Sequence, residues 1–243
     1  MQTSVTLIIP EKTDIEFEAV LRVWTDNGGA VKRLGRYWVK DEGLTRQNIA
    51  IYGNQTFAWV VAQIYGVTLI SPDDTLVVEL NRRWTCRNIT LMQIDEMTAA
   101  LFPVFIKPVV PKIFMAGIFN TLTDFQQVVN GLPFTEQVMV SDIVDNIQAE
   151  ARSFVGNGVI RDIALYEGTA DITSGEQFLA DFLAAHGSQL PATVVIDIAF
   201  SEHIGWFILE FNACWGAGLN NCLAEKVIDC IIAATNNDHP AVN

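Results

Sequence analysis

The stretch that most constrains the fold is residues 193–219, in which two apolar, strand-like segments carry a few polar side chains. The turn at residues 201–205 predicts that the two segments pair as a β-hairpin. Because strand side chains alternate between two faces, Asp197 falls on one face of the first segment. The same alternation aligns four residues on one face of the second segment: Trp206, Ile208, Glu210 and Asn212. Folding the hairpin therefore brings Asp197 near Glu210 and Asn212.

This set of oxygen atoms predicts a site for a hard metal ion. Two carboxylates held close together are costly unless a cation or a proton compensates their charge. Mg²⁺ prefers oxygen ligands, keeps part of its water shell and commonly shares its site with phosphates. The glycines of Trp215–Gly218 would let the backbone approach a ligand, ahead of a helix expected to begin near Leu219. A hairpin whose carboxylates simply face water would show the same pattern, so both interpretations stay open.

The composition indicates a globular protein with a large core, since half of the 243 residues are apolar. A formal net charge of −13 argues against nucleic acid or an anionic membrane as the main partner, because such partners attract lysine and arginine. The chain opens without a basic segment and contains no apolar run of about 18 residues, so we expect a cytoplasmic protein. The four cysteines lack metal-ligand spacing and are expected to be free thiols.

The first 80 residues alternate strand-like and helix-like segments, which predicts a βαβ unit with a small, mostly parallel sheet. The expected strands are Val5–Ile9, Asn48–Tyr52 and Val67–Ile70, and the expected helices are Glu11–Trp24 and a segment ending at Tyr65. Asn54 can cap the second helix and Gly66 can end it. Neither G-x-G-x-x-G nor G-x-x-x-x-G-K-[ST] occurs, so no dinucleotide fingerprint or Walker loop is available.

Charged side chains interrupt apolar strands in the middle of the chain. Lys107 lies in a proline-flanked strand at residues 103–109, where it could extend to a sheet edge or hold an anion such as phosphate. Downstream, Gly156–Gly158 predicts a hairpin turn, and alternation places Glu150 and Arg152 on one face of that hairpin. An exposed ion pair of little energetic value would look the same.

Taken in order, these motifs resemble the ATP-grasp superfamily. Asp197, Glu210 and Asn212 match its D…ExN arrangement, with spacings of thirteen and two residues. FIKP at residues 105–108 resembles the family strand whose lysine contacts nucleotide phosphates, and residues 148–168 resemble the family E-x-R hairpin.

Within the superfamily, the chain is similar to the phage- and bacterium-associated clade named for two arginines and one lysine, a group thought to contain peptide or amide ligases. Features typical of that clade occur along nearly the whole chain: RYW at 36–38, IYGNQTF at 51–57, LISPDD at 69–74, and LEFNACWGAGL at 209–219. The resemblance implies an α/β (α+β) ATP-grasp fold, in which an N-terminal open sheet precedes two subdomains that clasp the nucleotide.

The resemblance also implies roles for individual residues. Asp197, Glu210 and Asn212 would hold one or two Mg²⁺ ions against the β- and γ-phosphates of ATP. Lys107 would contact the phosphates, and Arg152 would stabilise the transferring phosphoryl group or an acyl phosphate.

Other residues are candidates for nucleotide contacts by the same resemblance. Residues 140–143 match the segment between the two clasping subdomains, where backbone groups, including those of Val140 and Ser141, would meet adenine and Asp142 would meet the ribose. For the second arginine of the clade, Arg87 is the first choice and Arg161 the second. Many superfamily members have a glycine-rich lid after the strand lysine, whereas residues 109–117 contain one glycine and add Lys112, a further candidate for binding the phosphates.

The expected division places an N-terminal βαβ subdomain at residues 1–85, a small subdomain with the strand lysine at 86–140, and a C-terminal subdomain with the metal site at 141–243. The last of these is expected to contain helices at Ser174–His186 and Leu219–Ala234.

The leading hypothesis is an ATP-dependent ligase that joins a small-molecule or peptide carboxylate to an amine through an acyl phosphate. An alternative is a non-catalytic module that binds Mg·ATP and couples binding to partner recognition. A third hypothesis is an interaction protein with no nucleotide site. The substrates and the oligomeric state are not specified by the sequence.

Overall fold

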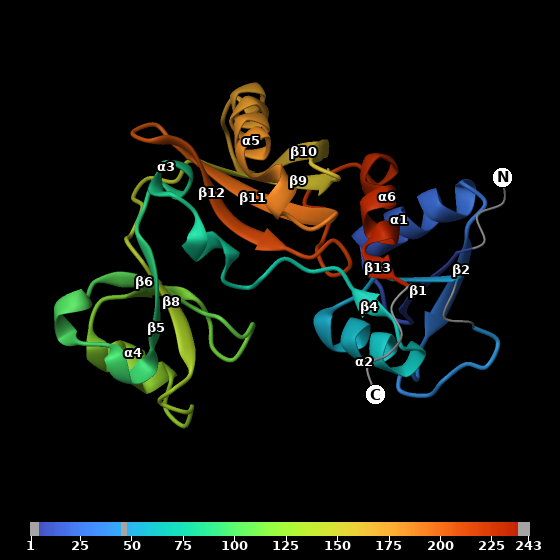
Figure 1. The fold of residues 1–243 in the computed structure, drawn as a ribbon, viewed down its shortest axis with the longest axis horizontal. Helices are drawn as coiled ribbons and strands as arrows, with labels where there is room; N and C mark the ends of the chain where they lie inside the picture. Colours follow the sequence, from blue (N-terminus) through green and yellow to red (C-terminus); the bar gives the residue numbers. More distant parts are fainter. Residues whose placement is uncertain (1–4, 45–47, 238–243) are drawn as a thin grey trace.

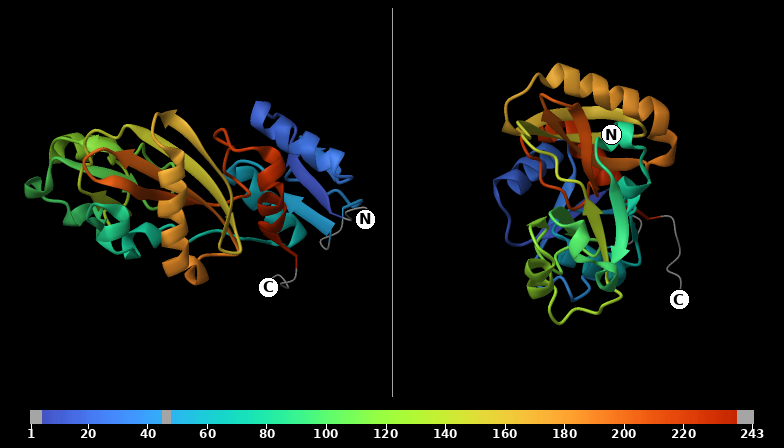
Figure 2. Two further views of the ribbon diagram at one scale, coloured as in Figure 1. Left: turned by 90° about the horizontal axis from the view of Figure 1, so that it is seen from above. Right: turned by 90° about the vertical axis from the view of Figure 1, so that its left-hand side faces the viewer.

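The computed structural model describes residues 5–44 and 48–237. The first four residues, which belong to the opening segment used for the expectation of a cytoplasmic protein, lie outside the described residues. The molecule is elongated, with three sheets following one another along its long axis (Figure 1). An N-terminal sheet lies at one end, a small four-stranded sheet at the other, and a larger four-stranded sheet between them. Figure 2 shows the same order from above.

The N-terminal sheet has the strand order β2-β1-β3 and is parallel, as the βαβ pattern predicts. Its elements are β1 (Thr6–Pro10), α1 (Ile15–Asp26), β2 (Ala30–Leu34), β3 (Ile49–Ile51) and α2 (Gln55–Tyr65). Asp14 caps α1, while Asn54 caps α2 and Gly66 ends it in the left-handed conformation. The edge strand β2 was not expected, because its mixed and largely exposed sequence lacks a clear alternation.

The chain returns to this sheet near its end. Helix α6 (Ala224–Ala233) packs against α1, and β13 (Thr235–Asn236) pairs antiparallel with β4 (Thr68–Leu69), so β4 is not a third parallel strand. The expectation that the last helix begins near Leu219 is wrong by several residues. Asn220 and Asn221 have φ values of 46° and 70°, a left-handed conformation that interrupts a right-handed helix.

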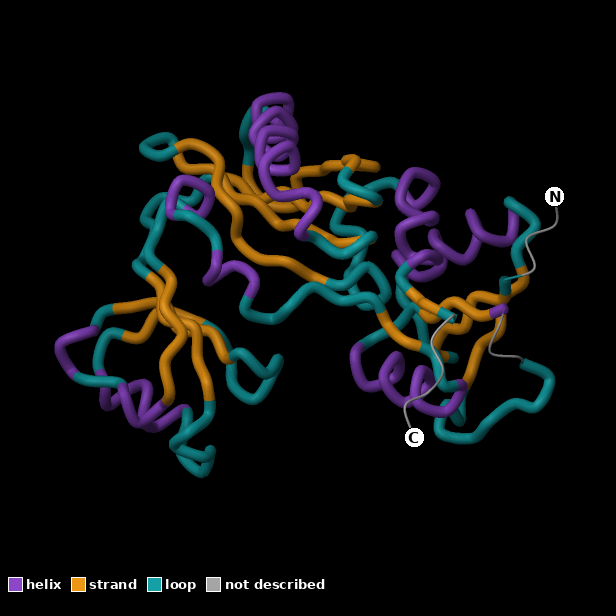
Figure 3. The backbone as a smooth tube through the Cα atoms, in the orientation of Figure 1, coloured by secondary structure: helices purple, strands orange, loops and turns teal. Residues whose placement is uncertain are grey.

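The small sheet has the order β5-β8-β6-β7. It consists of β5 (Ile89–Gln93), β6 (Val104–Pro108), β7 (Gly117–Phe119) and β8 (Gln137–Ser141), with α4 (Leu122–Val128) on one face. Between this sheet and the N-terminal one, residues 70–88 contain the short helices η2 (Leu76–Glu79) and α3 (Arg82–Thr85). Figure 3 shows this connection as a long loop passing beneath the central sheet, and both short helices contact β12 there.

The central sheet is antiparallel with the order β10-β9-β11-β12. Its elements are β9 (Ala149–Gly156), β10 (Val159–Gly168), α5 (Ile172–His186), β11 (Thr193–Ser201) and β12 (Gly205–Asn212). One face of the sheet packs against α5. In this core, Leu179 and Phe182 of α5 cluster with Val194, Ile196 and Ile198 of β11. The opposite face carries Arg152 and Asp197, so one face of the sheet is apolar and the other holds charged groups.

All four cysteines are free thiols, and Cys214, Cys222 and Cys230 are buried. Within the described ranges, the helices are too short or too polar for any of them to cross a membrane.

Candidate functional site

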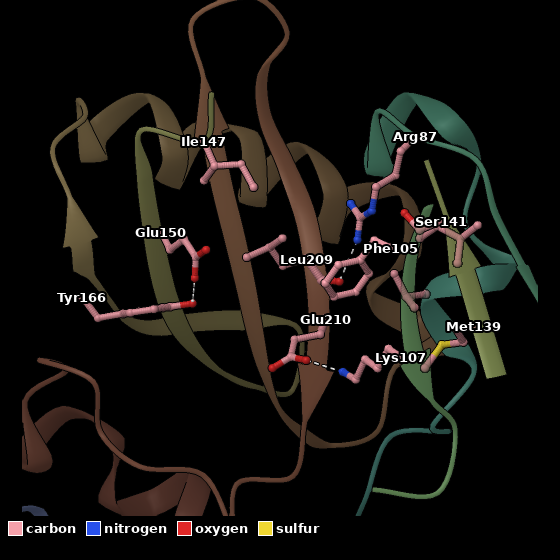
Figure 4. Close-up of a pocket in the computed structure, with 12 residues that line it drawn as sticks. Arg87, Phe105, Lys107, Met139, Ser141, Ile147, Glu150, Tyr166, Leu209 and Glu210 are labelled. Atoms are coloured by element: carbon pink, nitrogen blue, oxygen red, sulfur yellow. Dashed lines mark hydrogen bonds and ion pairs between the residues drawn. The ribbon is translucent and has the colours of Figure 1, made fainter. Parts of the chain in front are cut away.

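A cavity of about 320 Å³ lies between the central sheet and the small sheet (Figure 4). Both sheets contribute walls, and the residues before β5 close one end. The lining residues are Val77, Arg87, Ile89, Phe105, Lys107, Met139, Ser141, Ile147, Glu150, Tyr166, Leu209 and Glu210. Apolar side chains and a few ionisable groups thus face one space, which is typical of a small-molecule site.

Next to this cavity, three charged residues form a row across the central sheet. Asp197 on β11 lies opposite Arg152 on β9 and opposite Glu210 on β12. Directly opposed residues on neighbouring antiparallel strands have adjacent side chains on the same face. The hairpin predicted from the sequence therefore brings Asp197 and Glu210 together, and the neighbouring β9 strand adds Arg152.

Arg152 and Asp197 form a bidentate ion pair. Arg152 Nε donates to Asp197 Oδ1 at 2.8 Å, and Nη2 donates to Oδ2 at 2.6 Å. The side chains are 11% and 2% exposed, so the pair is shielded from water. Burial raises the pKa of the Asp197 carboxyl, and the guanidinium opposes that rise. Arg152 is therefore the group that permits a carboxylate at this depth.

Glu210 joins the two sheets. Lys107 Nζ on β6 donates to Glu210 Oε2, so the strand lysine of the small sheet meets the metal-competent acid of the central sheet. Asn212 Nδ2 donates to Glu210 Oε1 at 2.9 Å and to Asp197 Oδ2 at 3.1 Å. Burial alone would raise the pKa of the Glu210 carboxyl, but Lys107 and Asn212 outweigh it and the pKa lies below its usual value.

The expected alignment of Ile208 with Glu210 on one face is wrong. A β-bulge changes the register, so Asp197 pairs with Glu210 but the next residue, Ile198, pairs with Ile208. Leu209 is the extra residue, and both Leu209 and Glu210 line the cavity. Ile208 instead lies in the core beneath α5. A bulge inserts one residue and reverses the alternation beyond it, which strict period-2 counting cannot anticipate.

Glu150 and Tyr166 form a pair that sequence reasoning left without a role. The Tyr166 hydroxyl donates to Glu150 Oε2, and both residues line the cavity. Burial and the bond to Glu150 raise the pKa of Tyr166 well above its usual value, so it remains a hydroxyl donor. For Glu150, the sequence offered one signal, the strand alternation that places it on the same face as Arg152. Tyr166 reaches the cavity because β10 pairs with β9, and no local sequence pattern indicates this.

Arg87 is held by backbone carbonyls rather than by a carboxylate. Nη1 donates to Thr85 O and Ile208 O at 2.9 Å, and Nη2 donates to Leu209 O at 3.1 Å. Burial lowers the pKa of Arg87 to about 10, and the guanidinium keeps its charge at neutral pH. The side chain lines the cavity, so its remaining N–H donors are available to an anion there.

Replacing Arg87 with methionine should lower the free energy of unfolding by about 1–3 kcal/mol, because three backbone carbonyls lose their donor. Urea denaturation measures this difference. The Arg82→Met variant is the matched control, since Arg82 is exposed, and it should stay within about 0.5 kcal/mol of wild type. Equal stability of the two variants would show that the carbonyl contacts of Arg87 contribute little.

The three residues predicted at the adenine and ribose positions differ in placement. Ser141 lines the cavity, at the register position next to Phe105. Val140 points to the other face of the sheet, into the core around Phe125. Asp142 lies just beyond β8, and its Oδ2 accepts from Asn88 N at 3.0 Å and Asn88 Nδ2 at 2.7 Å.

Lys112 and Arg161 are not among the residues that line the cavity. Lys112 lies in the exposed connection between β6 and β7, with a φ of 68°. Arg161 is exposed on β10, and its Nη2 donates to Gly156 O at 3.4 Å. Between the two arginine candidates, the structure thus brings Arg87 to the cavity and leaves Arg161 near the β9–β10 turn.

The donor set near the cavity fits Mg²⁺ bound together with phosphates. Among the residues described, no three or more His, Cys, Asp or Glu side chains form a group able to hold a metal ion. Mg²⁺ requires fewer protein ligands, because it commonly uses one or two carboxylates with waters and substrate phosphates. Asp197 and Glu210 supply two carboxylates, and the amide of Asn212 contacts both.

Comparison with protein families gives a match over most of the chain. The matching model describes the ATP-grasp domain of the clade named for two arginines and one lysine, family 2, and it covers residues 84–230. That range includes the small sheet, the central sheet and most of α6. No sequence among the curated proteins matches this chain.

Solved structures share the fold at low sequence identity. A RimK domain ATP-grasp protein from Sphaerobacter thermophilus has a TM-score of 0.61 and 12% identity, with coverage of 93% of this chain and 99% of that one. D-cycloserine synthetase DcsG has a TM-score of 0.61 and 12% sequence identity, and the match covers 94% of this chain and 99% of that one. D-alanine–D-alanine ligase from Bacillus anthracis, complexed with ATP, has a TM-score of 0.54 and 11% sequence identity, and the match covers 95% of this chain and 96% of that one. The chain therefore shares the fold of these proteins over at least 93% of its length.

Proposed function

This chain belongs to the ATP-grasp domain proteins of the two-arginine, one-lysine clade, family 2, and from that premise we propose that it is an ATP-dependent carboxylate–amine ligase. Its products would be an amide or peptide, ADP and phosphate. Two of the proteins with this fold are named as a synthetase and a ligase, and the ligase was solved with ATP.

The observation that carries the proposal is the meeting of Lys107 with Glu210 at the cavity. These residues are 103 positions apart and come from different sheets. The lysine and the glutamate lie at the edge of one cavity and come from different sheets. The lysine can bind the phosphate oxygens while the glutamate binds the metal ion that accompanies them. The apolar residues at the rest of the cavity, such as Phe105 and Leu209, suit the flat face of a purine base.

Each polar or charged residue at the site has a part in this proposal. Asp197, Glu210 and Asn212 would hold Mg²⁺, which when bound neutralises charge on the phosphates. Lys107 would contact phosphate oxygens, and Arg87 would contribute its free N–H donors to the same chain of phosphates. Arg152 is held in place by Asp197, so its guanidinium would stabilise charge on the transferred group without having to reorganise.

The chemistry proposed needs no side-chain nucleophile. The substrate carboxylate attacks the γ-phosphorus, the bond to the bridging oxygen breaks, and ADP leaves. The amine then attacks the acyl carbon, and phosphate departs as the amide forms and the amine loses a proton. The protein would act by holding the reactants in line and by stabilising charge, which is enough for phosphoryl transfer.

Binding of Mg·ATP is the most direct test. At a ligand concentration 100 times Kd, binding should stabilise the native protein by about 2.7 kcal/mol and raise its unfolding temperature in a thermal-shift assay. Turnover is then measured as ADP release across paired carboxylates and amines, including amino acids and short peptides. Release that depends on both substrates supports a ligase.

Two outcomes would contradict this proposal. Tight binding of Mg·ATP without turnover for any pair would favour a module that couples nucleotide binding to partner recognition. An unfolding temperature that does not respond to Mg·ATP would rule out the nucleotide site itself.

A further inference from the structure

The loop at residues 213–221, which follows the β11–β12 hairpin, is hydrogen-bonded to residues of the N-terminal part of the chain outside the sheet strands. Gly53 N donates to Trp215 O at 3.0 Å, and the Tyr52 hydroxyl donates to Ala217 O at 2.9 Å. Trp215 Nε1 donates to Ser71 Oγ at 3.0 Å. The loop therefore connects the central sheet to a part of the chain that lines none of the cavity.

The strongest of these contacts comes from Glu16 in the first turn of α1. Its Oε2 accepts from Leu219 N at 2.9 Å and its Oε1 accepts from Asn220 N at 2.8 Å, so one carboxylate holds two consecutive backbone amides. A Cβ atom added at Gly218 would lie 2.6 Å from Glu16 Oε2, so glycine leaves room for this approach. Hydrogen bonds to an ionised acceptor are among the stronger ones in proteins.

The same loop reaches the charged row. Arg152 Nη1 donates to Gly218 O at 2.9 Å, next to the amides that Glu16 holds. The Arg152 guanidinium is thus fixed on two sides, by Asp197 through Nε and Nη2 and by the loop carbonyl through Nη1. Glu16 does not contact Arg152 directly, but it sets the position of the carbonyl that does.

We propose that Glu16 is a positioning residue for Arg152, acting through the backbone of Gly218–Asn220. This inference rests on the proposed function, in which Arg152 stabilises the transferred group. By this route α1, which adds no wall to the cavity, sets the orientation of the guanidinium. Displacement of a catalytic group by about 1 Å can reduce a rate about 100-fold.

The Glu16→Gln variant tests the contact with little change in shape. An amide offers one acceptor oxygen and places an NH₂ donor against the second backbone amide, so one of the two bonds is lost. We expect kcat to fall about 10- to 100-fold, while the KM for ATP stays within about twofold. The KM is retained because Lys107 and Glu210 lie outside this contact.

Glu18→Gln is the matched control on the same helix. Glu18 pairs with Arg33 on the exposed side of α1, so its replacement should leave kcat and KM unchanged. In an Arg152→Lys background, Glu16→Gln should lower kcat by less than about twofold, because residues that act through one another are not additive. A full, additive loss in that background would overturn the inference in favour of a general effect on folding.

A second measurement does not depend on turnover. In ¹⁵N NMR spectra, the Arg152 Nε–H signal should shift in Glu16→Gln and keep its position in Glu18→Gln. If wild type showed no ATP-dependent turnover, the ligase proposal would fail while this spectrum still tested the contact. If wild type were active and Glu16→Gln matched it in both kcat and the Arg152 signal, the positioning role would be refuted.

Discussion

Replacing Arg152 with methionine should lower the free energy of unfolding by about 3–5 kcal/mol. Methionine has a similar length and packs in an apolar setting, so the main loss is the partner of Asp197. That carboxylate is 2% exposed, and without the guanidinium it would keep the hydrogen bond from the neutral amide of Asn212 but no cationic partner among the described residues. An uncompensated buried charge is costly because the surrounding protein solvates it poorly. Urea denaturation at pH 7 measures the difference.

The Asp197→Asn change tested together with Arg152→Met identifies the cause. An uncharged amide no longer needs the guanidinium, so the double variant should recover a large part of the lost stability. Arg33→Met serves as the control, since Arg33 forms a bidentate pair with Glu18 in which both side chains are at least 40% exposed. Exposed pairs contribute little, so this variant should unfold close to wild type. An equal loss in both arginine variants would contradict the role assigned to burial.

Replacing Glu210 with glutamine should reduce ATP-dependent turnover by at least about 100-fold, if the proposed function holds. Glutamine is nearly isosteric and can keep the bond from Asn212, but it lacks the negative charge that a cation and Lys107 would need. Lys107→Ala should cause a similar loss by removing the positive charge at the cavity. ADP release in the presence of both substrates measures the effect, and thermal shift with Mg·ATP reports binding separately.

Two exposed residues provide controls for these variants. Glu202 lies in the turn between β11 and β12, and Lys40 lies in a loop of the N-terminal part, so Glu202→Gln and Lys40→Ala should keep wild-type turnover. Retention of full activity by Glu210→Gln and Lys107→Ala would place the chemistry elsewhere in the molecule. Loss of turnover with an unchanged response to Mg·ATP would restrict these residues to the chemical step.

Four charged side chains at the site form two ion pairs. Lys107 and Arg152 balance Glu210 and Asp197, so the site is close to neutral. A metal ion arriving with a phosphate chain would bring both signs of charge, allowing Lys107 to exchange Glu210 for a phosphate oxygen. The ion pairs seen here therefore correspond to the same groups that the proposed reaction would use.

Local sequence signals identified much of the scaffold. Asn54 and Gly66 bound α2 as their capping preferences predict, and the turn before Gly205 produces the β11–β12 hairpin. These features depend on residues close together in sequence. The motif order also led to the ATP-grasp superfamily, which the family comparison confirms.

Other features depended on how distant strands pair. The bulge at Leu209 reversed the alternation of β12, and no residue in that strand signals it. Strand alternation turns the Val140 side chain into the core around Phe125, which leaves its backbone for the adenine contact expected there. The assignment of the nucleotide-binding residues themselves stays a prediction.

The sequence by itself determined the β11–β12 hairpin and the two caps of α2, because these features follow from the properties of neighbouring residues. Only the tertiary structure decided that Lys107 meets Glu210, that Arg152 shields Asp197 and that Glu16 reaches the loop beyond the hairpin. These contacts join residues 103, 45 and 203 positions apart. Their formation depends on sheet register and subdomain packing, which no local period in the sequence specifies.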